Sequence, residues 1–406
     1  MDHVFQSLLL FFMIYITLSN AADILQNPDF EIAPMNISSV NATSQFLLLH
    51  NKENPIPGWW FDGTVWYVTP AANLSLPGNG HAIRLGENGR INQTFQGTDD
   101  YSDYILTFTL AAQNENCFNN FTAVNVSVLD PEYDDVRSRV FSLWMNSSRH
   151  LWISYGFHLG SWGSKKDSIS LDIKSVAQSS DQNFTCWPVV DNFILKRNGM
   201  PRWYEGNQIA NGDFEIGPAV IKNSSEGILL SEDSTSYHTP LQQWKILGTV
   251  KYIDSKHFKI PRGNAAIELF SGSSGIQADF VFQLKQTYTL NFTIGDANDS
   301  CVGDLLVFLQ VGNDVWNYTL QGNGTGSAKS RHSVSFSIAT ESSRDTSIVF
   351  YRFNETWASD GVLCGPVLDN ISLYSSNSNS NSNSRKMELW FGVVISSLVL
   401  GLMILV

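Results

Sequence analysis

CWPVVDNFIL at residues 186–195 returns as CGPVLDNISL at residues 364–373. Each copy places a cysteine two residues before a proline, and an apolar pair, Asp-Asn and alternating apolar residues follow. This alternation predicts a β-strand that buries one face. A distinctive segment that occurs twice indicates that the domain around it also occurs twice.

The segments upstream of the two copies match in the same order. NPDFE at residues 27–31 returns as NGDFE at residues 211–215, a shift of 211 − 27 = 184 residues. YILTFTLAAQNENC at residues 104–117 returns as YTLNFTIGDANDSC at residues 288–301, again a shift of 184. The closing motif shifts by 364 − 186 = 178 residues, so the copies differ little in length. This spacing predicts two tandem homologous domains.

Short alternating runs fill both repeats, and Gly, Pro, Asn and Asp separate them. Regular short strands between turn residues predict an all-β fold, a β-sandwich or jelly roll with a core of alternate residues. The predicted order along the chain is a signal peptide at 1–21, a first sandwich at 22–198, a linker at 199–206, a second sandwich at 207–374, a Ser/Asn-rich stalk and spacer at 375–388, and an apolar tail at 389–406.

Both ends of the chain carry targeting signals. Residues 1–21 hold an apolar run that ends in Ser-Asn-Ala, which is typical of a cleaved signal peptide; an uncleaved membrane anchor is the alternative. Near the other end, small residues, a polar spacer and an apolar tail predict a glycosylphosphatidylinositol (GPI) anchor. The candidate attachment residues are Asn377, Ser378, Asn379 and Ser380.

A single transmembrane helix is the alternative for the tail, whose 406 − 388 = 18 residues could just span a bilayer. Arg385 and Lys386 oppose it, because they would lie on the outer side, against the positive-inside rule. We therefore expect a secreted lipoprotein on the outer face of the plasma membrane and in the cell wall.

The four cysteines fall two per repeat at matched positions. Of the three possible pairings, only Cys117–Cys186 with Cys301–Cys364 gives both repeats the same bridge. A secreted chain folds in an oxidising compartment, which favours disulfides. Each bridge would contribute roughly 4 kcal/mol on the chain-entropy model.

Asn-x-Ser/Thr sequons are dense along the chain, which behind a signal peptide predicts a glycosylated extracellular protein. The candidate acceptors are Asn36, Asn41, Asn73, Asn92, Asn120, Asn125, Asn146, Asn183, Asn223, Asn291, Asn298, Asn317, Asn323, Asn354 and Asn370.

Composition and motifs exclude several classes of function. The formal net charge is −13, which repels nucleic acid and disfavours polyanionic sugars, but leaves neutral glycans and basic proteins as partners. The sequence contains no nucleophile elbow, HExxH motif, phosphate-binding loop or dinucleotide fingerprint. Most of its candidate acid–base carboxylates recur in both repeats, which suits a scaffold role, so we expect no enzyme activity.

The repeated series resembles a specific family. NPDFE, PGWW with GTVWYV, AIRLG and CWPVVDNFIL, with their second copies, look like the plant cell-wall proteins that carry the domain of unknown function 642. The resemblance covers residues 23–374 and implies two galactose-binding-like jelly rolls, association with wall polysaccharides and pectin methylesterases, and in some members a lipid anchor. The first repeat departs from the pattern with AAQNEN where the second has GDANDS.

The same motifs resemble carbohydrate-binding modules in which similar residues hold a structural calcium ion. The candidate ligand pairs are Glu31 with Asp191, and Glu215 with Asp369. Carboxylate oxygens suit Ca²⁺, a hard cation. The alternative is that these carboxylates cap turns beside the first and last strands.

Two non-catalytic functions remain open: a lectin-like module that binds cellulose or hemicellulose, and a docking scaffold for a wall-modifying enzyme such as pectin methylesterase. For the first, Trp60 and Trp66 are the candidate binding residues, because Lys245 and Lys251 take their places in the second repeat. Since lysine is rarely buried unpaired, we expect both tryptophans to point outward and to form one stacking platform in the first domain. A loop or the other domain covering this face is the alternative.

Overall fold

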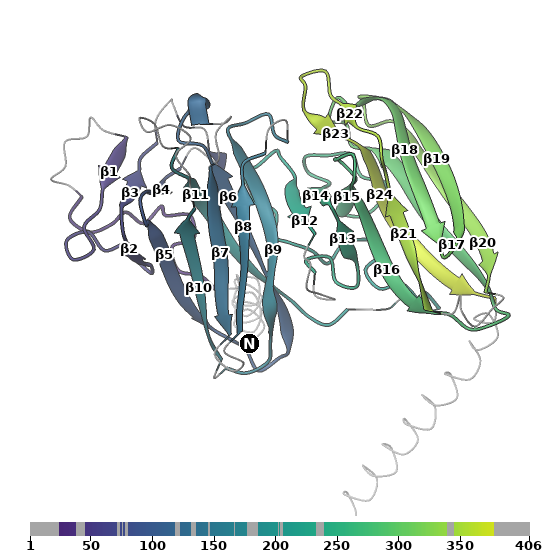
Figure 1. Ribbon diagram of the computed structural model, residues 1–406, viewed down its shortest axis with the longest axis horizontal. Coiled ribbons are helices and arrows are strands. Elements are labelled where there is room, and N and C mark those ends of the chain that lie inside the picture. Colours follow the sequence, from purple (N-terminus) through teal and green to yellow (C-terminus); the bar gives the residue numbers. More distant parts are fainter. Residues whose placement is uncertain are drawn as a thin grey trace, which may run out of the picture. The chain divides into compact units, whose positions relative to one another are not determined.

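The computed structural model describes residues 24–37, 45–70, 74, 76–77, 80–117, 122–130, 135–144, 147–165, 167–176, 186–201, 203, 206–232, 239–338 and 345–376. The chain forms two compact units (Figure 1). The first contains the described residues up to Met200, together with Gly217–Leu230 and Asp360–Val362, and the second contains the rest. Strands dominate both units, which confirms the predicted all-β fold.

The first unit is a sandwich of two sheets. One sheet has the order β1 (Phe46–Leu48), β3 (Val65–Val68), β4 (Ala82–Leu85), β11 (Val189–Asn198), β6 (Ser102–Ala111) and β9 (Trp152–Trp162). The facing sheet has the order β2 (Trp60–Asp62), β5 (Arg90–Gln96), β10 (Ser168–Ser175), β7 (Ala123–Asp130) and β8 (Asp135–Ser142). A short 3-10 turn, η3 (Glu115–Cys117), precedes β7, and β12 (Ile228–Ser231) pairs in parallel with β9.

The second unit repeats this arrangement. One sheet has the order β14 (Thr249–Asp254), β15 (Ala265–Glu268), β24 (Pro366–Ser375), β17 (Thr287–Asp296) and β20 (Lys329–Ser337). The facing sheet has the order β13 (Lys245–Leu247), β16 (Gly275–Val281), β21 (Asp345–Tyr351), β18 (Val302–Val311) and β19 (Asp314–Asn323). A short hairpin pairs β22 (Thr356–Trp357) with β23 (Leu363–Cys364).

Alternate residues of the central strands fill each core, as strand periodicity requires. On β6 these are Tyr104, Leu106, Phe108 and Leu110, all buried, and on β17 they are Tyr288, Leu290, Phe292 and Ile294, also buried. The predicted jelly-roll sandwiches are therefore confirmed, with the repeated strand at the centre of each.

Both predicted disulfides are confirmed. Cys117 bonds to Cys186 with the Cα atoms 5.3 Å apart, and Cys301 bonds to Cys364 with the Cα atoms 5.7 Å apart. All four cysteines are buried. Each bridge ties the loop after the central strand to the segment that leads into the closing strand.

Several predictions concern residues outside the described ranges. These are the signal peptide, the anchor candidates Asn377, Ser378, Asn379 and Ser380, the apolar tail, and the sequons at Asn41, Asn73, Asn120, Asn146 and Asn183. The ten other sequon asparagines are all at least partly exposed. Within the described ranges, no helix combines the length and the apolar character needed to cross a bilayer.

The repeated Asn-x-Asp-Phe-Glu segment folds into the same tight turn in both units. Asn27 and Phe30 have φ angles of 47° and 54°, and Asn211 and Phe214 have φ angles of 51° and 52°. Left-handed backbone is uncommon for asparagine and unfavourable for phenylalanine, so surrounding contacts must hold it. The Asn27 side chain donates to the carbonyl of Ile32 (3.0 Å) and accepts from its N–H (2.9 Å).

Buried aromatic side chains fix this turn to the sandwich. Trp59 Nε1 donates to the carbonyl of Asn27 (3.1 Å), and the Tyr67 hydroxyl donates to the carbonyl of Phe30 (3.0 Å). The second unit has the equivalent bonds from Trp244 (3.2 Å) and Tyr252 (3.1 Å). Both tryptophans are buried, so they pack in the cores of the two sandwiches.

We expect Asn211→Ala to lower the free energy of unfolding by about 3 kcal/mol. The side chain is buried and bonds the carbonyls of Ile216 (2.7 Å) and Leu241 (2.6 Å), and alanine is disfavoured at its φ. Asn88→Ala is the matched control, because Asn88 is left-handed but exposed. Equal losses in the two variants in chemical denaturation would show that backbone strain alone accounts for the effect.

Candidate functional site

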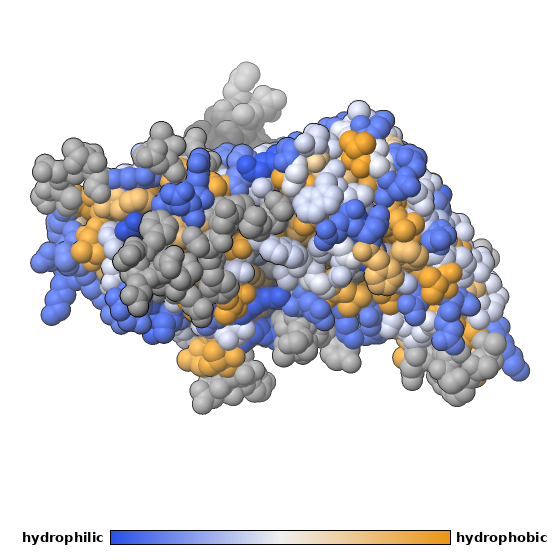
Figure 2. Space-filling view, turned by 45° about the horizontal axis from the view of Figure 1, so that its top comes forward, coloured by the Kyte–Doolittle hydropathy of each residue, from blue (hydrophilic) through white to orange (hydrophobic). Residues whose placement is uncertain are grey.

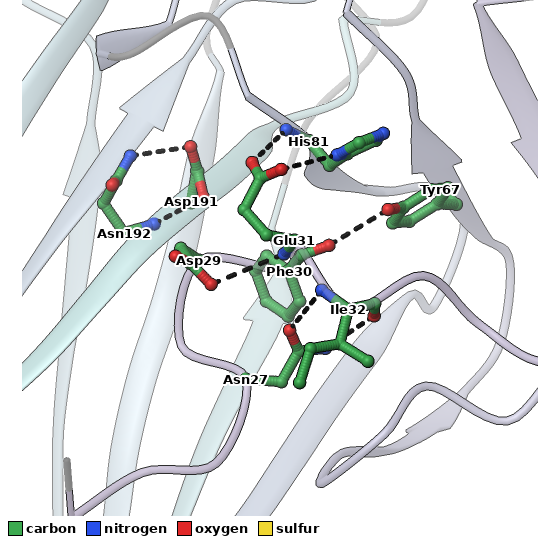
Figure 3. A network of polar contacts seen from close by, with 9 residues as sticks. All are labelled: Asn27, Asp29, Phe30, Glu31, Ile32, Tyr67, His81, Asp191 and Asn192. Atoms are coloured by element: carbon green, nitrogen blue, oxygen red, sulfur yellow. Dashed lines mark hydrogen bonds and ion pairs between the residues drawn. The ribbon is translucent and has the colours of Figure 1, made fainter. Parts of the chain in front are cut away.

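The turn of each unit presents a glutamate to a neighbouring loop, and Figure 3 shows this site in the first unit. Glu31 accepts hydrogen bonds from the His81 backbone N–H (2.7 Å) and from His81 Nδ1 (2.8 Å). Glu215 accepts from the Asn264 backbone N–H (2.6 Å) and from Asn264 Nδ2 (3.1 Å). The same carboxylate position is therefore occupied in both repeats, with a different side-chain donor.

A buried aspartate of the closing strand completes each site. Asp191 accepts from the backbone N–H and the side chain of Asn192, both at 2.6 Å. Asp369 accepts from the backbone N–H groups of Asn370 (2.5 Å) and Arg262 (2.7 Å). Burial raises the pKa of Asp191 well above its ordinary value and that of Asp369 to about 7.

The structure brings the two predicted carboxylate pairs together and adds a third carboxylate to each. Asp29 acts on Asp191 together with Glu31, and Asp213 acts on Asp369 together with Glu215; their negative charges also raise the pKa of the buried aspartates. The prediction missed Asp29 and Asp213, although both lie within the repeated turn. Each aspartate stands two residues before the glutamate of its turn, and this repeated spacing could have identified it as a candidate ligand.

This donor set fits a hard cation and a turn cap equally well. Each of the four predicted carboxylates accepts a backbone N–H, as capping requires. Each carboxylate oxygen also keeps lone-pair capacity beyond one hydrogen bond. Within the described part of the chain, the group whose ligand atoms already lie within 4.8 Å of one another is a different one: Asp299 with the disulfide-bonded Cys301 and Cys364.

The predicted platform of Trp60 and Trp66 is wrong in its geometry. Trp60 lies on β2 and Trp66 on β3, which belong to the two facing sheets, so their outward faces point in opposite directions. Trp60 is 48% exposed, as expected. Trp66 is half-buried, and the guanidinium of Arg84 lies 3.8 Å from its ring centroid. The chain passes from one sheet to the other between β2 and β3. The alternation of side chains along the sequence does not reveal this change of sheet.

The comparison with Lys251 was also misleading, because Lys251 is buried and paired. Its Nζ lies 3.1 Å from Glu268 Oε2, and both side chains are almost wholly enclosed. Glu268 also accepts the backbone N–H of Gly365 (2.9 Å). Burial raises the pKa of Glu268 to about 7, with Asp299 adding to the rise and Lys251 opposing it. The cross-strand position that holds Trp66 and Arg84 in the first unit thus holds an ion pair in the second.

The five-stranded sheet of the second unit carries a groove on its outer face, with a cavity volume of about 620 Å³. The strand register sets outward positions in two neighbouring rows across this sheet. The first row consists of Lys245, Gln277, Val349, Gln310 and Val315. The second row consists of Leu247, Gly275, Tyr351, Phe308 and Asn317. We call this feature the aromatic groove.

Aromatic rings line one side of the aromatic groove. Phe308 and Tyr351 stack with their centroids 5.4 Å apart, and Phe353, which is 70% exposed, lies 5.0 Å from Tyr351. Gly275 stands between Leu247 and Tyr351, and a Cβ atom there would lie only 2.7 Å from the Phe350 carbonyl oxygen, so the strands need glycine at this position. Figure 2 shows apolar residues, in orange, set among hydrophilic ones on the second unit at the right.

Amides and hydroxyls line the other side of the aromatic groove. Gln277 donates to Asp279 (2.7 Å) and to the Ser347 hydroxyl (3.1 Å), and Gln310 donates to the carbonyl of Gly312 (2.9 Å). These bonds hold the amides in place. Neither residue is fully buried.

The same face of the first unit is polar and charged. Its two equivalent rows are Trp60, Asn92, Asp172, Ser127 and Ser138, then Asp62, Arg90, Lys174, Asn125 and Val140. The row that is aromatic in the second unit therefore holds charged side chains here. The sequence comparison missed this difference. It compared Trp60 and Trp66 with their counterparts in the second repeat, but not the other strands of the five-stranded sheets.

The family model for DUF642, described as a protein of unknown function, matches residues 23–196 and 207–374. The chain belongs to the DUF642 family. Two curated relatives of this DUF642 protein come from Arabidopsis thaliana. "Protein DUF642 L-galactono-1,4-lactone-responsive gene 2" is 31% identical over 90% of this chain and 97% of its own length. "Protein TEEBE" is 31% identical over 86% of this chain and 90% of its own length.

Solved structures with some likeness to the DUF642 protein include carbohydrate-binding modules. The tandem CBM22-1–CBM22-2 domain of Paenibacillus barcinonensis Xyn10C covers 83% of this chain and 100% of its own, at 10% identity and a TM-score of 0.26. TmCBM61 in complex with β-1,4-galactotriose covers 43% of this chain and 99% of its own, at 15% identity and a TM-score of 0.27. Scores this low carry no argument about the site of the DUF642 protein.

We expect Lys251→Met to destabilise the DUF642 protein by roughly 3–5 kcal/mol at neutral pH, because Glu268 is left buried without its cation. Without Lys251, whose charge opposes the rise, the pKa of Glu268 lies above about 7, so the loss should shrink as the pH falls towards 7 and the carboxylate takes up a proton. The double variant Lys251→Met/Glu268→Gln should recover most of the loss, since glutamine still accepts the Gly365 N–H.

Lys245→Met is the matched control for this cycle. Lys245 pairs with Asp279 at the surface (2.5 Å), so its loss should cost under about 1 kcal/mol. Chemical denaturation of the Lys251→Met, Glu268→Gln and double variants gives the coupling energy. Strictly additive losses in the Lys251 and Glu268 variants would contradict a coupled ion pair.

Proposed function

We propose that this DUF642 protein is a non-catalytic cell-surface protein of the plant cell wall that binds a neutral polysaccharide of the cellulose or hemicellulose type. The aromatic groove of the second unit is the proposed binding site. The observation that carries the proposal is the aromatic row beside a row of amides, because sugar rings have apolar faces and hydroxyl edges. The volume of about 620 Å³ falls in the range of ligand sites.

The geometry suggests how each side of the groove contributes. Phe353 and Tyr351 offer ring faces to the C–H face of a pyranose. The amides of Gln277 and Gln310 are prepositioned, so they bond ring hydroxyls without first losing side-chain freedom. Lys245, the charged residue of these rows, pairs with Asp279, and the other side chains of the rows are uncharged, which favours a neutral chain. Trp60 remains a candidate for a separate single stacking contact on the first unit, while Arg84 already covers one face of Trp66.

We expect Phe353→Ala to weaken binding to hemicellulose roughly fivefold, which matches the usual worth of one aromatic stacking contact. Gln310→Ala should weaken it by a similar factor through the lost hydrogen bond. Phe353 is mostly exposed, so its removal should leave the thermal midpoint unchanged. Affinity electrophoresis in soluble hemicelluloses and pull-down on insoluble cellulose measure the effect.

Trp357→Ala is the matched control, because Trp357 is exposed on the β22–β23 hairpin outside the groove. It should bind like the parent. Trp60→Ala tests the first unit in the same assay. Full binding by Phe353→Ala together with loss in Trp60→Ala would move the site to the first unit and overturn the groove.

Docking of a wall-modifying enzyme such as pectin methylesterase is the second candidate function. It is favoured by exposed apolar residues on the outer face of β7 and β8, namely Leu129, Val136 and Val140. Leu129 and Val136 are direct cross-strand partners. Capture of purified pectin methylesterase by the parent, lost on Val136→Ser/Val140→Ser, would support docking over sugar binding.

The proposal also includes the cell-surface location. The signal peptide, the sequons and the Ser/Asn-rich stalk with an apolar tail support secretion and a GPI anchor. The anchor would hold the two units at the outer face of the plasma membrane, where wall polysaccharide lies.

We further propose that the two carboxylate groups hold structural calcium, with Glu31 and Asp191 as ligands in the first unit and Glu215 and Asp369 in the second. Asp29 and Asp213 add negative charge to each set. A bound cation would neutralise charges that now raise the pKa of the buried aspartates. Its role would be to stabilise the turn on which each sandwich closes.

We expect millimolar calcium to raise the free energy of unfolding of protein first stripped with chelator, by about 2.7 kcal/mol at a concentration of 100 times Kd, and so to raise its thermal midpoint. Protonation of Asp369, whose pKa is about 7, stabilises the metal-free protein at low pH, and this contribution is lost as the pH rises through about 7. The calcium effect should therefore be largest above pH 7.

Asp369→Asn and Asp191→Asn should each remove part of the calcium shift. Asp172→Asn, which breaks a surface ion pair with Arg90, is the control and should keep the shift. If calcium leaves the midpoint of the stripped parent unmoved, the carboxylates serve as turn caps only.

A further inference from the structure

The second unit contains another cavity, of about 720 Å³, beside its repeated turn. It is lined by both acidic and basic side chains, and by Asn291, Ser372 and Tyr374 from the outer face of β17 and β24. We call it the arginine pocket, after Arg262 and Arg331. We propose that the arginine pocket is a second saccharide site, separate from the aromatic groove, that binds a sugar bearing a carboxylate.

The two arginines supply the recognition element for the carboxylate. Both side chains are exposed. Arg262 bonds only an amide oxygen through its guanidinium, that of Asn370 (3.1 Å), and within the described residues no ion pair engages Arg331. A guanidinium without an acidic partner is suited to bidentate binding of a carboxylate.

Further basic residues gather around the same end of the sheet. Lys329 pairs across the strands with Gly295, and Arg331 pairs with Thr293 two positions along. Pro261, next to Arg262, packs over Gly295, and Lys259 packs against Gly326. The pocket lining itself balances Arg262 and Arg331 against Asp213 and Glu215, so it is less negative than a chain of net charge −13 as a whole.

The remaining lining suits the rest of a sugar ring. Tyr374 is 38% exposed and offers a ring face for stacking. Asn291 and Ser372 are direct cross-strand partners that offer an amide and a hydroxyl. Glu215 lies at the turn end of the pocket, where a carboxylate oxygen accepts bonds from sugar hydroxyls. Glu215 would repel a second carboxylate at the turn end of the pocket. We therefore expect one carboxylate per bound sugar, placed beside the arginines.

The equivalent face of the first unit is closed. Thr107 and Ser154, which stand where the second unit has Asn291 and Arg331, are fully buried. The segment Gly217–Leu230 belongs to the first unit, and Leu230 packs so closely over Gly156 that a side chain there would collide at 2.5 Å. The arginine pocket is therefore specific to the second unit.

The test uses oligogalacturonate as the probe and its fully methyl-esterified form as a neutral match. We expect the full-length parent to bind the charged oligomer at least about tenfold more tightly than the ester. Arg331→Gln and Arg262→Gln should each remove about tenfold of that affinity, the usual worth of a charge-assisted hydrogen bond. Arg331→Lys should give an intermediate loss, because lysine keeps the charge but not the bidentate geometry.

Three controls separate the arginine pocket from other effects. Lys174→Gln removes an equal charge from the surface of the first unit and should bind like the parent. Phe353→Ala should lose hemicellulose binding only, so that failure of the groove and failure of the pocket are distinguishable. Asn291 and Asn370 are sequons within the pocket lining, so protein made with and without N-glycans is compared.

Tighter binding of the charged oligomer that depends on both arginines, in either glycosylation state, supports the site. Equal binding of charged and esterified oligomers overturns it, as does unchanged affinity in both arginine variants. Absence of oligogalacturonate binding by protein without N-glycans also overturns it.

Discussion

Each sandwich depends on one constraint, the anchoring of a left-handed turn at its start to the closing strand at its end. The N–H of Phe193 donates to the carbonyl of Pro28 (2.8 Å), and the N–H of Ile371 donates to the carbonyl of Gly212 (2.7 Å). Buried tryptophan and tyrosine side chains hold the same turn from the core side. Because this turn brings carboxylates beside a buried aspartate, the closure of the fold also builds the candidate cation site.

The two repeats share this framework and differ in the faces they expose. In the first unit, charged residues cross the outer face of the five-stranded sheet, and Gly217–Leu230 covers part of the opposite one. In the second unit, the outer face of the five-stranded sheet carries aromatic rings. The opposite sheet of this unit opens into a pocket with two arginines. Duplication thus preserved the core and left the surfaces free to diverge, which is why both proposed saccharide pockets lie in the second unit.

The sequence predicted the features that repetition and local chemistry determine. The strand class, the two sandwiches, both disulfides and the grouping of Glu31 with Asp191 follow from matched positions. Surface sites were harder, because they depend on which strands become neighbours. Parity placed Trp60 and Trp66 on outward faces but not on opposite sheets, and it gave no sign that Glu268 lies across from Lys251 to pair with it in the core.

The membership of Gly217–Leu230 in the first unit has a consequence for the evolution of the chain. The first folded unit contains more of the chain than the first sequence repeat, because it includes a segment that follows this repeat in the sequence. Lys196 and Asn198 already bond the carbonyl of Gly217 (2.8 and 3.2 Å). A cut between the two repeats would therefore separate the first sandwich from the segment that packs over Gly156, so loss or transfer of one repeat at that point would disrupt the first sandwich.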